Sequence, residues 1–500
     1  MKIAVIGAGP AAAGVCLGLT EDVHRELDIT LFDIGRHMGG LAETLNGLSP
    51  RWDKSLYHRL HREIRNAGKG WIPEKSYFGE IPGKYLDSSV FRSDMFGGLS
   101  KFWGASFVPF IEEDMRNWPF YGQELSKYYQ KLLDHIRITG AHDRMSSYFS
   151  ADWFNESPIQ VPGVMSRLEQ VINGSPSSRF IAGAPRLALT NSGPKGCTYC
   201  GHCFYGCYNG SIYTADQTIR ELIGRKLVKY AAGKQMLRFS NESGAVKIDI
   251  KDTGTGEIEL LRFDKVYLAA GCLETSRIIS NSVGIKQFPI VENPMFHVPI
   301  IFTGRAKAKE FTEMLALHNV LIGRLPGEEI NSYVHMQVYP LNLYLWNHAL
   351  SKLMGNVGLS ISDLAQRTVG KHVYMMLFYF HGDLTRGSTV QFDGERMNLQ
   401  FRYESGLNHQ AKQVLRELSA VLQRSGFHVG TPFMSQLPPG GSYHYAGTVP
   451  AGPDYADASL CEWVKGVHVC DSASFPSLPA QNHSYTIMAN AYRIADQSLT

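Results

Sequence analysis

Short apolar runs near the N-terminus and in the middle of the chain predict buried strands. Residues 2–6, 28–33 and 266–270 are each rich in apolar side chains and end at glycine or an acidic residue. Runs of this length are typical of strands buried on both faces of a parallel sheet. The residues that follow the first and third runs pass through a glycine turn into a segment that favours a helix. Strand and helix therefore alternate, as in an α/β fold.

Other segments show the patterns of antiparallel strands and of an amphipathic helix. Residues 246–252 and 257–262 alternate between apolar and polar positions around a Thr-Gly-Thr-Gly turn, which predicts a β-hairpin. Residues 372–380 and 397–402 predict strands of a second, antiparallel sheet. Residues 403–426 predict a helix with one apolar face, formed by Ala411, Val414, Leu415, Leu418 and Leu422. The pattern thus predicts a doubly wound parallel sheet and a second α+β domain built on an antiparallel sheet.

Composition and charge exclude several classes of protein. The 500 residues exceed what one core usually holds, so two or three domains are expected. The net charge of +3 and the lack of a Lys/Arg run argue against a nucleic-acid partner. No run approaches the roughly 18 apolar residues that cross a bilayer, and the aromatic-rich residues 333–354 are expected to be buried in the second domain. Because the first predicted strand begins at residue 2, we expect no signal peptide and a cytoplasmic protein.

The N-terminal glycines match the fingerprint of a dinucleotide-binding turn. Gly7, Gly9 and Ala12 have the Gly-x-Gly-x-x-Ala spacing, followed by Gly14. Asp33 ends the second strand about twenty residues further on, where an acceptor for a ribose hydroxyl is expected. The turn at residues 35–40, which includes Gly39 and Gly40, is typical of FAD proteins. These positions predict an FAD site with the pyrophosphate at a helix N-terminus.

The C-terminal sixty residues carry the most informative pattern in the chain. His444 precedes a Gly-Thr turn, and a short apolar strand then ends at Asp471. A proline-rich loop leads to Asn482 and His483, and a helix is predicted to open near residues 484–486. This arrangement resembles the C-terminal signature of the glucose-methanol-choline (GMC) FAD oxidoreductases. The resemblance implies that these polar residues face the flavin and that Asp471, Ala473 and Thr486 lie at the cofactor.

Two further segments extend this resemblance, which covers about a third of the residues. Gly97, Gly98 and Ser100 resemble the family's Gly-Gly-x-Ser loop beside the flavin ring, where backbone without a Cβ can lie against a flat ring. Phe102 stands where some relatives carry a histidine bonded to the flavin, which implies non-covalent FAD. Gly271 lies in a segment that resembles the closing strand and helix of the cofactor domain.

The chemistry expected of this site is the oxidation of a CH–OH group. FAD takes the hydride at N5, so the protein must supply a base and hold the alcohol over the ring. His444 is the expected base, because imidazole titrates near neutral pH. Asn482 stands four residues before Thr486, as the family's asparagine does, but His483 occupies a position where relatives usually have proline. Either Asn482 or His483 is therefore the expected partner of His444.

A run of cysteines departs from an ordinary member of that family. Cys197, Cys200, Cys203 and Cys207 have the C-x2-C-x2-C-x3-C spacing of bacterial ferredoxins without the final proline. This spacing favours an iron–sulfur cluster, [4Fe–4S] or [3Fe–4S], over zinc or ordinary thiols. A cluster near FAD implies a dehydrogenase that passes electrons to a protein acceptor.

The prediction is therefore an FAD-dependent dehydrogenase of a sugar, polyol or secondary alcohol with an iron–sulfur relay. The rivals are an oxygen-using oxidase without a cluster, a non-redox enzyme similar to FAD sugar mutases, and a non-enzymatic electron-transfer module. The FAD domain is expected to be assembled from residues 1–60, 90–110, 210–290 and 455–500. Residues 111–190 and 291–454 are expected to form the substrate domain, with the cysteine run inserted at 191–209.

Overall fold

The structure is a computed structural model of the whole chain. It describes residues 1–35, 92–305, 317–340, 370–450 and 462–499, with short interruptions at 23, 25, 102, 117, 120–121, 150–152, 176–177, 200–202, 204–206, 208, 243, 329 and 395. None of the helices in this described part is long and apolar enough to cross a membrane.

A six-stranded sheet brings together strands from the two ends and the middle of the chain. Its order is β19 (Glu462–Val464), β20 (Val467–Val469), β8 (Lys265–Leu268), β1 (Lys2–Ile6), β2 (Asp28–Asp33) and β4 (Lys229–Ala232). All neighbours are parallel except β19 and β20. β1, β2 and β8 contain the three apolar runs, so the parallel arrangement predicted for them is confirmed.

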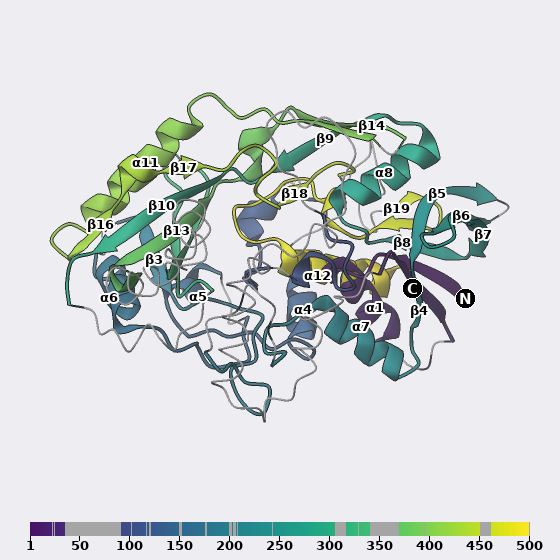
Figure 1. Cartoon of the computed structure of the whole chain (residues 1–500), viewed down its shortest axis with the longest axis horizontal. Coiled ribbons are helices and arrows are strands. Elements are labelled where there is room, and N and C mark those ends of the chain that lie inside the picture. Colours follow the sequence, from purple (N-terminus) through teal and green to yellow (C-terminus); the bar gives the residue numbers. More distant parts are fainter. Residues whose placement is uncertain are drawn as a thin grey trace, which may run out of the picture.

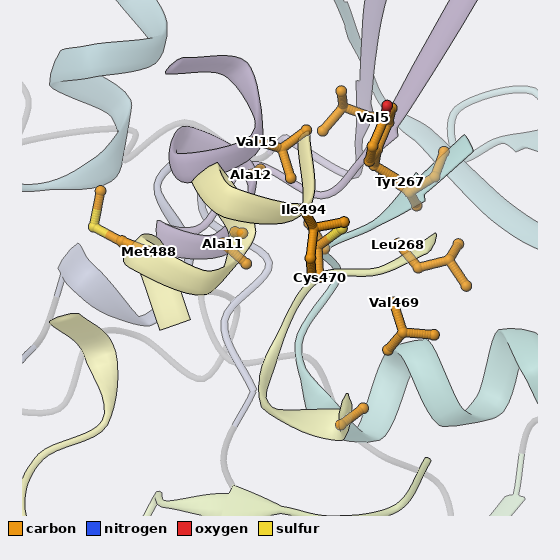
Figure 2. Packing of buried hydrophobic residues seen from close by; sticks show 14 of the residues in the cluster. Val5, Ala11, Ala12, Val15, Tyr267, Leu268, Val469, Cys470, Met488 and Ile494 are labelled. Carbon is orange, nitrogen blue, oxygen red and sulfur yellow. The ribbon is translucent and has the colours of Figure 1, made fainter. Parts of the chain in front are cut away.

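Helices and a β-meander complete the core around this sheet. α1 (Pro10–Thr20) and α12 (Ser484–Gln497) pack side by side through small residues and contribute Ala11, Ala12, Met488 and Ile494 to the core shown in Figure 2. α4 (Gly122–Leu132), α7 (Ala215–Gly224) and α8 (Cys272–Val283) add to the same core. The meander β5 (Lys234–Glu242), β6 (Ala245–Asp252) and β7 (Ile258–Phe263) contains the predicted hairpin and also packs into it.

A second large sheet is antiparallel and lies at the other end of the molecule (Figure 1). Its order is β16 (Phe427–Val429), β10 (Met295–Phe302), β13 (Val373–Tyr379), β12 (Val334–Pro340), β11 (Val320–Arg324) and β3 (Phe180–Gly183), with β17 (Ser435–Gln436) also paired to β10. α6 (Gly163–Asn173) and α11 (Leu407–Val421) cover one face. α11 buries the apolar face predicted from the sequence.

The two faces of this antiparallel sheet differ in chemistry because side chains alternate along each strand. On β12, Val334, Met336 and Val338 point into the apolar core formed with α6 and α11. Tyr333, just before β12, shares the opposite face with His335, Gln337 and Tyr339 (hereafter the polar face of β12). The polar face therefore belongs to the interior of the molecule and not to the apolar core behind the sheet.

A smaller sheet and short helices connect these two parts. The small sheet has the order β15 (Arg396–Gln400), β14 (Ser388–Asp393), β9 (Gln287–Glu292) and β18 (Tyr445–Ala446). α5 (Arg144–Tyr148) and the 3-10 turns η2 (Gly98–Lys101), η3 (Glu112–Met115), η6 (Gly370–His372), η7 (Gly382–Thr385), η8 (Thr431–Phe433) and η9 (Ser472–Ser474) complete the described elements. The expected mixed α/β fold, with one parallel sheet and antiparallel sheets, is confirmed; the predicted domain boundaries stay a prediction.

Candidate active site

Two glycine turns meet at the start of α1. Gly7 has a φ of +104°, and a Cβ there would lie 2.5 Å from the carbonyl oxygen of Ala269. The Cα of Gly9 lies 3.1 Å from the position of a Cβ on Gly98, whose φ is +59°. Gly9, the N-cap residue of α1, has no side chain that could cap the helix, so the first N–H groups of α1 can meet an anionic ligand. This close approach of bare backbone fits the pyrophosphate-binding turn predicted from the sequence.

Other predicted cofactor residues surround this turn in the structure. Asp33 ends β2, and its carboxylate accepts from the Tyr230 hydroxyl at 3.5 Å and from the backbone N–H groups of Ile34 and Gly35. Burial raises the pKa of Asp33 to about 7, which suits a carboxylate that gains hydrogen bonds from a ligand. Ser100 accepts a hydrogen bond from the backbone N–H of Ala215 and donates to the carbonyl of Gly97, so it fixes the glycine loop.

The turn after β20 and the turn before α8 are joined by the Asp471 side chain. The Asp471 carboxylate accepts hydrogen bonds from the N–H groups of Gly271 and Ala473 and from the Thr275 hydroxyl. It thereby joins the end of β20 to the start of α8, and burial raises its pKa to about 6. Gly271 has a φ of +90°, a conformation that favours glycine.

Two residues predicted to bind the cofactor, Gly14 and Thr486, instead make contacts with other parts of the protein. A Cβ on Gly14 would lie 2.5 Å from the carbonyl oxygen of Met488, so this glycine lets α1 pack closely on α12. The Thr486 hydroxyl lies 2.7 Å from the Tyr129 hydroxyl and accepts from the N–H of Phe110. Gly39, Gly40 and Phe102 lie outside the described residues.

The structure brings His444, Asn482 and His483 together. His444 Nε2 lies 3.4 Å from the side-chain nitrogen of Asn482, and the His444 and His483 rings are 4.7 Å apart. Tyr379 of β13 stacks on His444 with a ring separation of 5.5 Å. Of the two candidate partners, Asn482 makes the polar contact with His444, whereas the Nδ1 of His483 has no hydrogen-bond partner among the described residues.

Asn293 determines which nitrogen of His444 carries the proton. Its side-chain N–H groups face the carbonyl oxygens of Phe380, Leu478 and Pro479, at 3.0 to 3.3 Å. Its side-chain oxygen is therefore the atom that faces His444 Nδ1, at 3.0 Å. Since an amide oxygen accepts, neutral His444 must donate from Nδ1. This leaves Nε2 unprotonated and directed toward Asn482.

Gln337 orients Asn482 in the same way. The side-chain nitrogen of Gln337 donates to the side-chain oxygen of Asn482 at 2.5 Å, and its oxygen accepts from the Tyr339 hydroxyl at 2.7 Å. Asn482 therefore presents its N–H groups toward His444 Nε2. A proton acceptor and a hydrogen-bond donor thus stand side by side, which is the arrangement that receives an alcohol O–H group.

Burial sets the protonation state of the two histidines, His444 and His483. Desolvation lowers the pKa of His444 to about 4 and that of His483 well below its ordinary value. His444 is therefore neutral at pH 7 and able to accept a proton. Buried Glu292, next to Asn293, holds the loop before His444 by accepting from the Gly440 N–H and the Ser442 hydroxyl.

Sequence reasoning did not find Asn293, Gln337 or Glu292. Each acts through a partner more than a hundred residues away, so no local spacing marks it. The period-two row Tyr333, His335, Gln337 and Tyr339 was the available signal. It indicates a strand with one polar, buried face.

The described cysteines give the predicted metal site no support. Cys197, Cys203 and Cys207 pack against one small apolar cluster that includes Trp103 and Leu317. In the part of the chain that the structure describes, no three His, Cys, Asp or Glu side chains are placed to hold a metal ion. Cys200 lies outside the described residues.

The fold resembles that of an enzyme of known structure. The crystal structure of pyridoxine 4-oxidase from Mesorbium loti matches with a TM-score of 0.64 over 99% of this chain and 98% of that chain. The two sequences are 13% identical, so the likeness concerns the fold. No family model and no curated protein match the sequence. The fold expected from the GMC resemblance is thus confirmed, whereas the activity is argued below.

Proposed function

We propose that the protein is an FAD-dependent oxidoreductase of the GMC type that oxidises a CH–OH group of a small alcohol. The proposal rests on one observation: the unprotonated Nε2 of His444 lies beside the N–H groups of Asn482. An alcohol between them donates its proton to His444 and accepts a hydrogen bond from Asn482. The second contact stabilises the negative charge that develops on oxygen as the proton leaves.

The residues that would hold FAD fit this proposal. Gly7, Gly9 and Gly98 would leave room for the pyrophosphate at the start of α1, and Asp33 at the end of β2 would accept from a ribose hydroxyl. FAD, when bound, supplies the acceptor for the hydride that leaves carbon. His444 and Asn482 bind and orient the alcohol, His444 takes its proton, and Asn293 orients His444 through Nδ1.

The first experiment measures flavin reduction. The protein is purified with its bound cofactor and mixed anaerobically with sugars, polyols and secondary alcohols, and flavin absorbance is followed by stopped flow. His444→Ala is expected to slow reduction by about 10²–10⁴-fold, because it removes the general base. His409→Ala on the exposed side of α11 is the matched control and should stay within about twofold of the parent.

Two results would overturn the proposal. One is purified protein that binds no FAD, and the other is an H444A variant that reduces its flavin as fast as the parent. Turnover of a sugar without any electron acceptor would favour the mutase-like rival. Electron transfer that is indifferent to H444A would favour the non-enzymatic rival.

The electron acceptor separates two forms of this function. The neighbouring fold belongs to an enzyme named as an oxidase, which favours oxygen as acceptor. The cysteine run favours an iron–sulfur cluster and a protein acceptor. Iron and acid-labile sulfide per FAD decide between them: about three or four of each support the cluster. Absence of iron together with stoichiometric peroxide formation supports the oxidase. A cytoplasmic location stays a prediction.

A further inference from the structure

The polar face of β12 carries buried polar groups that the proposed chemistry does not use. Gln337 orients Asn482, and Tyr339 donates to Gln337. Tyr333 and His335 lie further along the same face and are 1% and 0% exposed. Tyr148, at the end of α5, stacks on Tyr333 with ring centroids 4.7 Å apart.

Several atoms in this region have no hydrogen-bond partner. Among the described residues, the hydroxyls of Tyr148 and Tyr333 and the Nδ1 of His335 are buried and unpaired, as are both ring nitrogens of His318. A buried polar group left unpaired costs free energy, so folded proteins rarely collect several in one place. Such a collection is expected where a polar ligand completes the hydrogen bonds.

The unpaired groups are connected to the His444–Asn482 pair by a continuous row of rings. Tyr333 lies 6.0 Å from His335, His335 lies 6.0 Å from Tyr379, and Tyr379 stacks on His444. A ligand with one hydroxyl at His444 and further hydroxyls along its carbon chain can therefore hydrogen-bond the unpaired groups of His335 and Tyr333. The sheet also makes room for Tyr333, because a Cβ on Gly323 would lie 2.6 Å from the Tyr333 hydroxyl.

The chemistry of the row selects a neutral ligand. The side-chain nitrogen of Gln337 has two protons and lies near three polar atoms, Asn482 Oδ1 at 2.5 Å, Ser106 Oγ at 3.0 Å and His335 Nε2 at 3.1 Å. The unpaired Nδ1 of neutral His335 donates in one tautomer and accepts in the other, so it can bond a ligand hydroxyl in either.

Tyr148 and Tyr333 each offer a neutral hydroxyl that donates or accepts. Burial and, after it, the Asp114 carboxyl raise the pKa of both phenols, while the Arg186 guanidinium opposes this at Tyr333. Both hydroxyls therefore stay neutral, and Asp114 disfavours an anion beside them. The stacked rings also cover one face of each other, which leaves their polar edges to make contacts.

We propose that Tyr148, Tyr333 and His335 form a subsite for the distal hydroxyl groups of a neutral polyhydroxylated substrate. One further hydroxyl of that substrate lies between His444 and Asn482. This inference rests on the proposed function and narrows its substrate class to sugars and polyols over simple secondary alcohols.

Paired substrates and paired variants test the subsite. The holoprotein is reduced anaerobically with sorbitol or myo-inositol and, in parallel, with 2-butanol, for the parent and for Tyr333→Phe and Tyr148→Phe. Each variant is expected to lose about tenfold in kcat/KM for the polyol, the loss of one hydrogen bond to substrate, and to stay within about twofold for 2-butanol. Tyr374→Phe is the matched control, because its hydroxyl donates to the Lys371 carbonyl on the apolar side of the same sheet.

Thermal unfolding provides a readout without turnover. Y333F and Y148F remove unpaired hydroxyls, so without ligand their Tm should equal or exceed that of the parent, whereas Y374F should lower it. Polyol should raise the Tm of the parent and of Y374F, and this shift should shrink in Y333F and Y148F.

The outcomes separate this inference from the proposed function. The subsite would be overturned if 2-butanol reduced the flavin as efficiently as either polyol. It would also be overturned if the variants lost kcat/KM equally for both kinds of substrate. Alcohol oxidation would stand in both cases. A Tm lowered by Y333F as much as by Y374F would also overturn it. If no alcohol reduces the flavin but polyol still raises the Tm through Tyr333, the proposed function fails and the subsite stands.

Discussion

His444 depends on its neighbours for both the state and the position of its proton. Burial lowers its pKa to about 4, so the ring is neutral at pH 7. Asn293 accepts from Nδ1 and leaves Nε2 free to act as base. Below its pKa His444 carries the proton on Nε2 and cannot accept another, so the acid limb of kcat/KM should lie well below pH 6.

Replacing Asn293 tests this account at a single residue. In Asn293→Asp a carboxylate accepts the same Nδ1–H and stabilises imidazolium, so the acid limb should move to higher pH while kcat near pH 8 stays close to that of the parent. In Asn293→Ala the acceptor is lost, and kcat should fall about tenfold or more, by less than in H444A. Anaerobic flavin reduction from pH 4.5 to pH 9 measures both.

Asn293 also donates to three backbone carbonyls, so each variant needs a check of its fold. Tm and FAD content identify variants that only destabilise the protein. A positioning role predicts a shifted pH profile in N293D at parental FAD content. An N293A enzyme with the kcat of the parent would contradict the assignment.

The sequence indicated the candidate catalytic side chains, but not the residues that orient them. The three residues His444, Asn482 and His483 lie in a C-terminal segment whose residue pattern already indicated a site. The choice between Asn482 and His483 needed coordinates, because it depends on a hydrogen bond from Gln337 on a distant strand. Asn293 could not be predicted either, because a single asparagine after a strand does not indicate which distant residue it will contact.

At the level of elements, the contact between α1 and α12 is set by glycine. A Cβ on Gly14 would lie 2.5 Å from the Met488 carbonyl oxygen, and one on Gly18 would lie 2.5 Å from that of Tyr492. Both oxygens are backbone atoms and cannot swing aside. Gly14→Ala is therefore expected to destabilise the protein by about 1–3 kcal/mol, as overpacking usually does.

Gly224 at the end of α7 is the matched control for that substitution. A Cβ there meets no atom within 4 Å, and its backbone is helical. Gly224→Ala should be neutral or stabilise by about 0.4–1 kcal/mol through the unfolded chain. Denaturant unfolding of the two variants measures the difference, and equal midpoints would show that helix packing does not depend on Gly14.

Elements with a clear apolar pattern were predicted accurately, including β1 and β2, whose bounds match the apolar runs 2–6 and 28–33. α11 and the hairpin of β6 and β7 follow their patterns closely because water covers one side of each. β12 was missed as a strand because both of its faces are buried, one against apolar helices and one against the site. Its polar residues also face the interior, so the ordinary contrast between inside and outside does not apply.

At the scale of the whole molecule, the interior holds many groups that stay uncharged. Burial lowers the pKa of His297, His318, His335, His444 and His483. It raises the pKa of Asp33, Asp114 and Asp471 to between about 6 and about 7. The two sets oppose each other as the pH falls, because the unfolded chain binds more protons at the histidines and fewer at the carboxyls.

The histidines should dominate, which makes the protein sensitive to acid. Near pH 5 an unfolded histidine is protonated and a buried one is not, so each costs stability as the pH falls below about 6.5. The carboxyls take up protons in the folded state over the same range and offset part of this loss. Among the described residues, burial also lowers the pKa of His135 and His381 and raises the pKa of Glu169 and Glu292, so seven histidines stand against five carboxyls. The excess of two histidines corresponds to roughly two protons, or about 2–3 kcal/mol of unfolding free energy per pH unit.

Urea unfolding of the holoprotein at pH 7, 6 and 5 measures this slope. His318→Leu should reduce it by on the order of 1 kcal/mol per pH unit, because the buried ring binds no proton in the fold but binds one when unfolded. His409→Ala, on the exposed side of α11, is the control substitution and should leave the slope unchanged. A free energy of unfolding that stays constant or increases as the pH falls from 6.5 to 5 would mean that these histidine rings are solvated or hydrogen-bonded. The Nδ1 of His335 would then no longer indicate a ligand site on the polar face of β12.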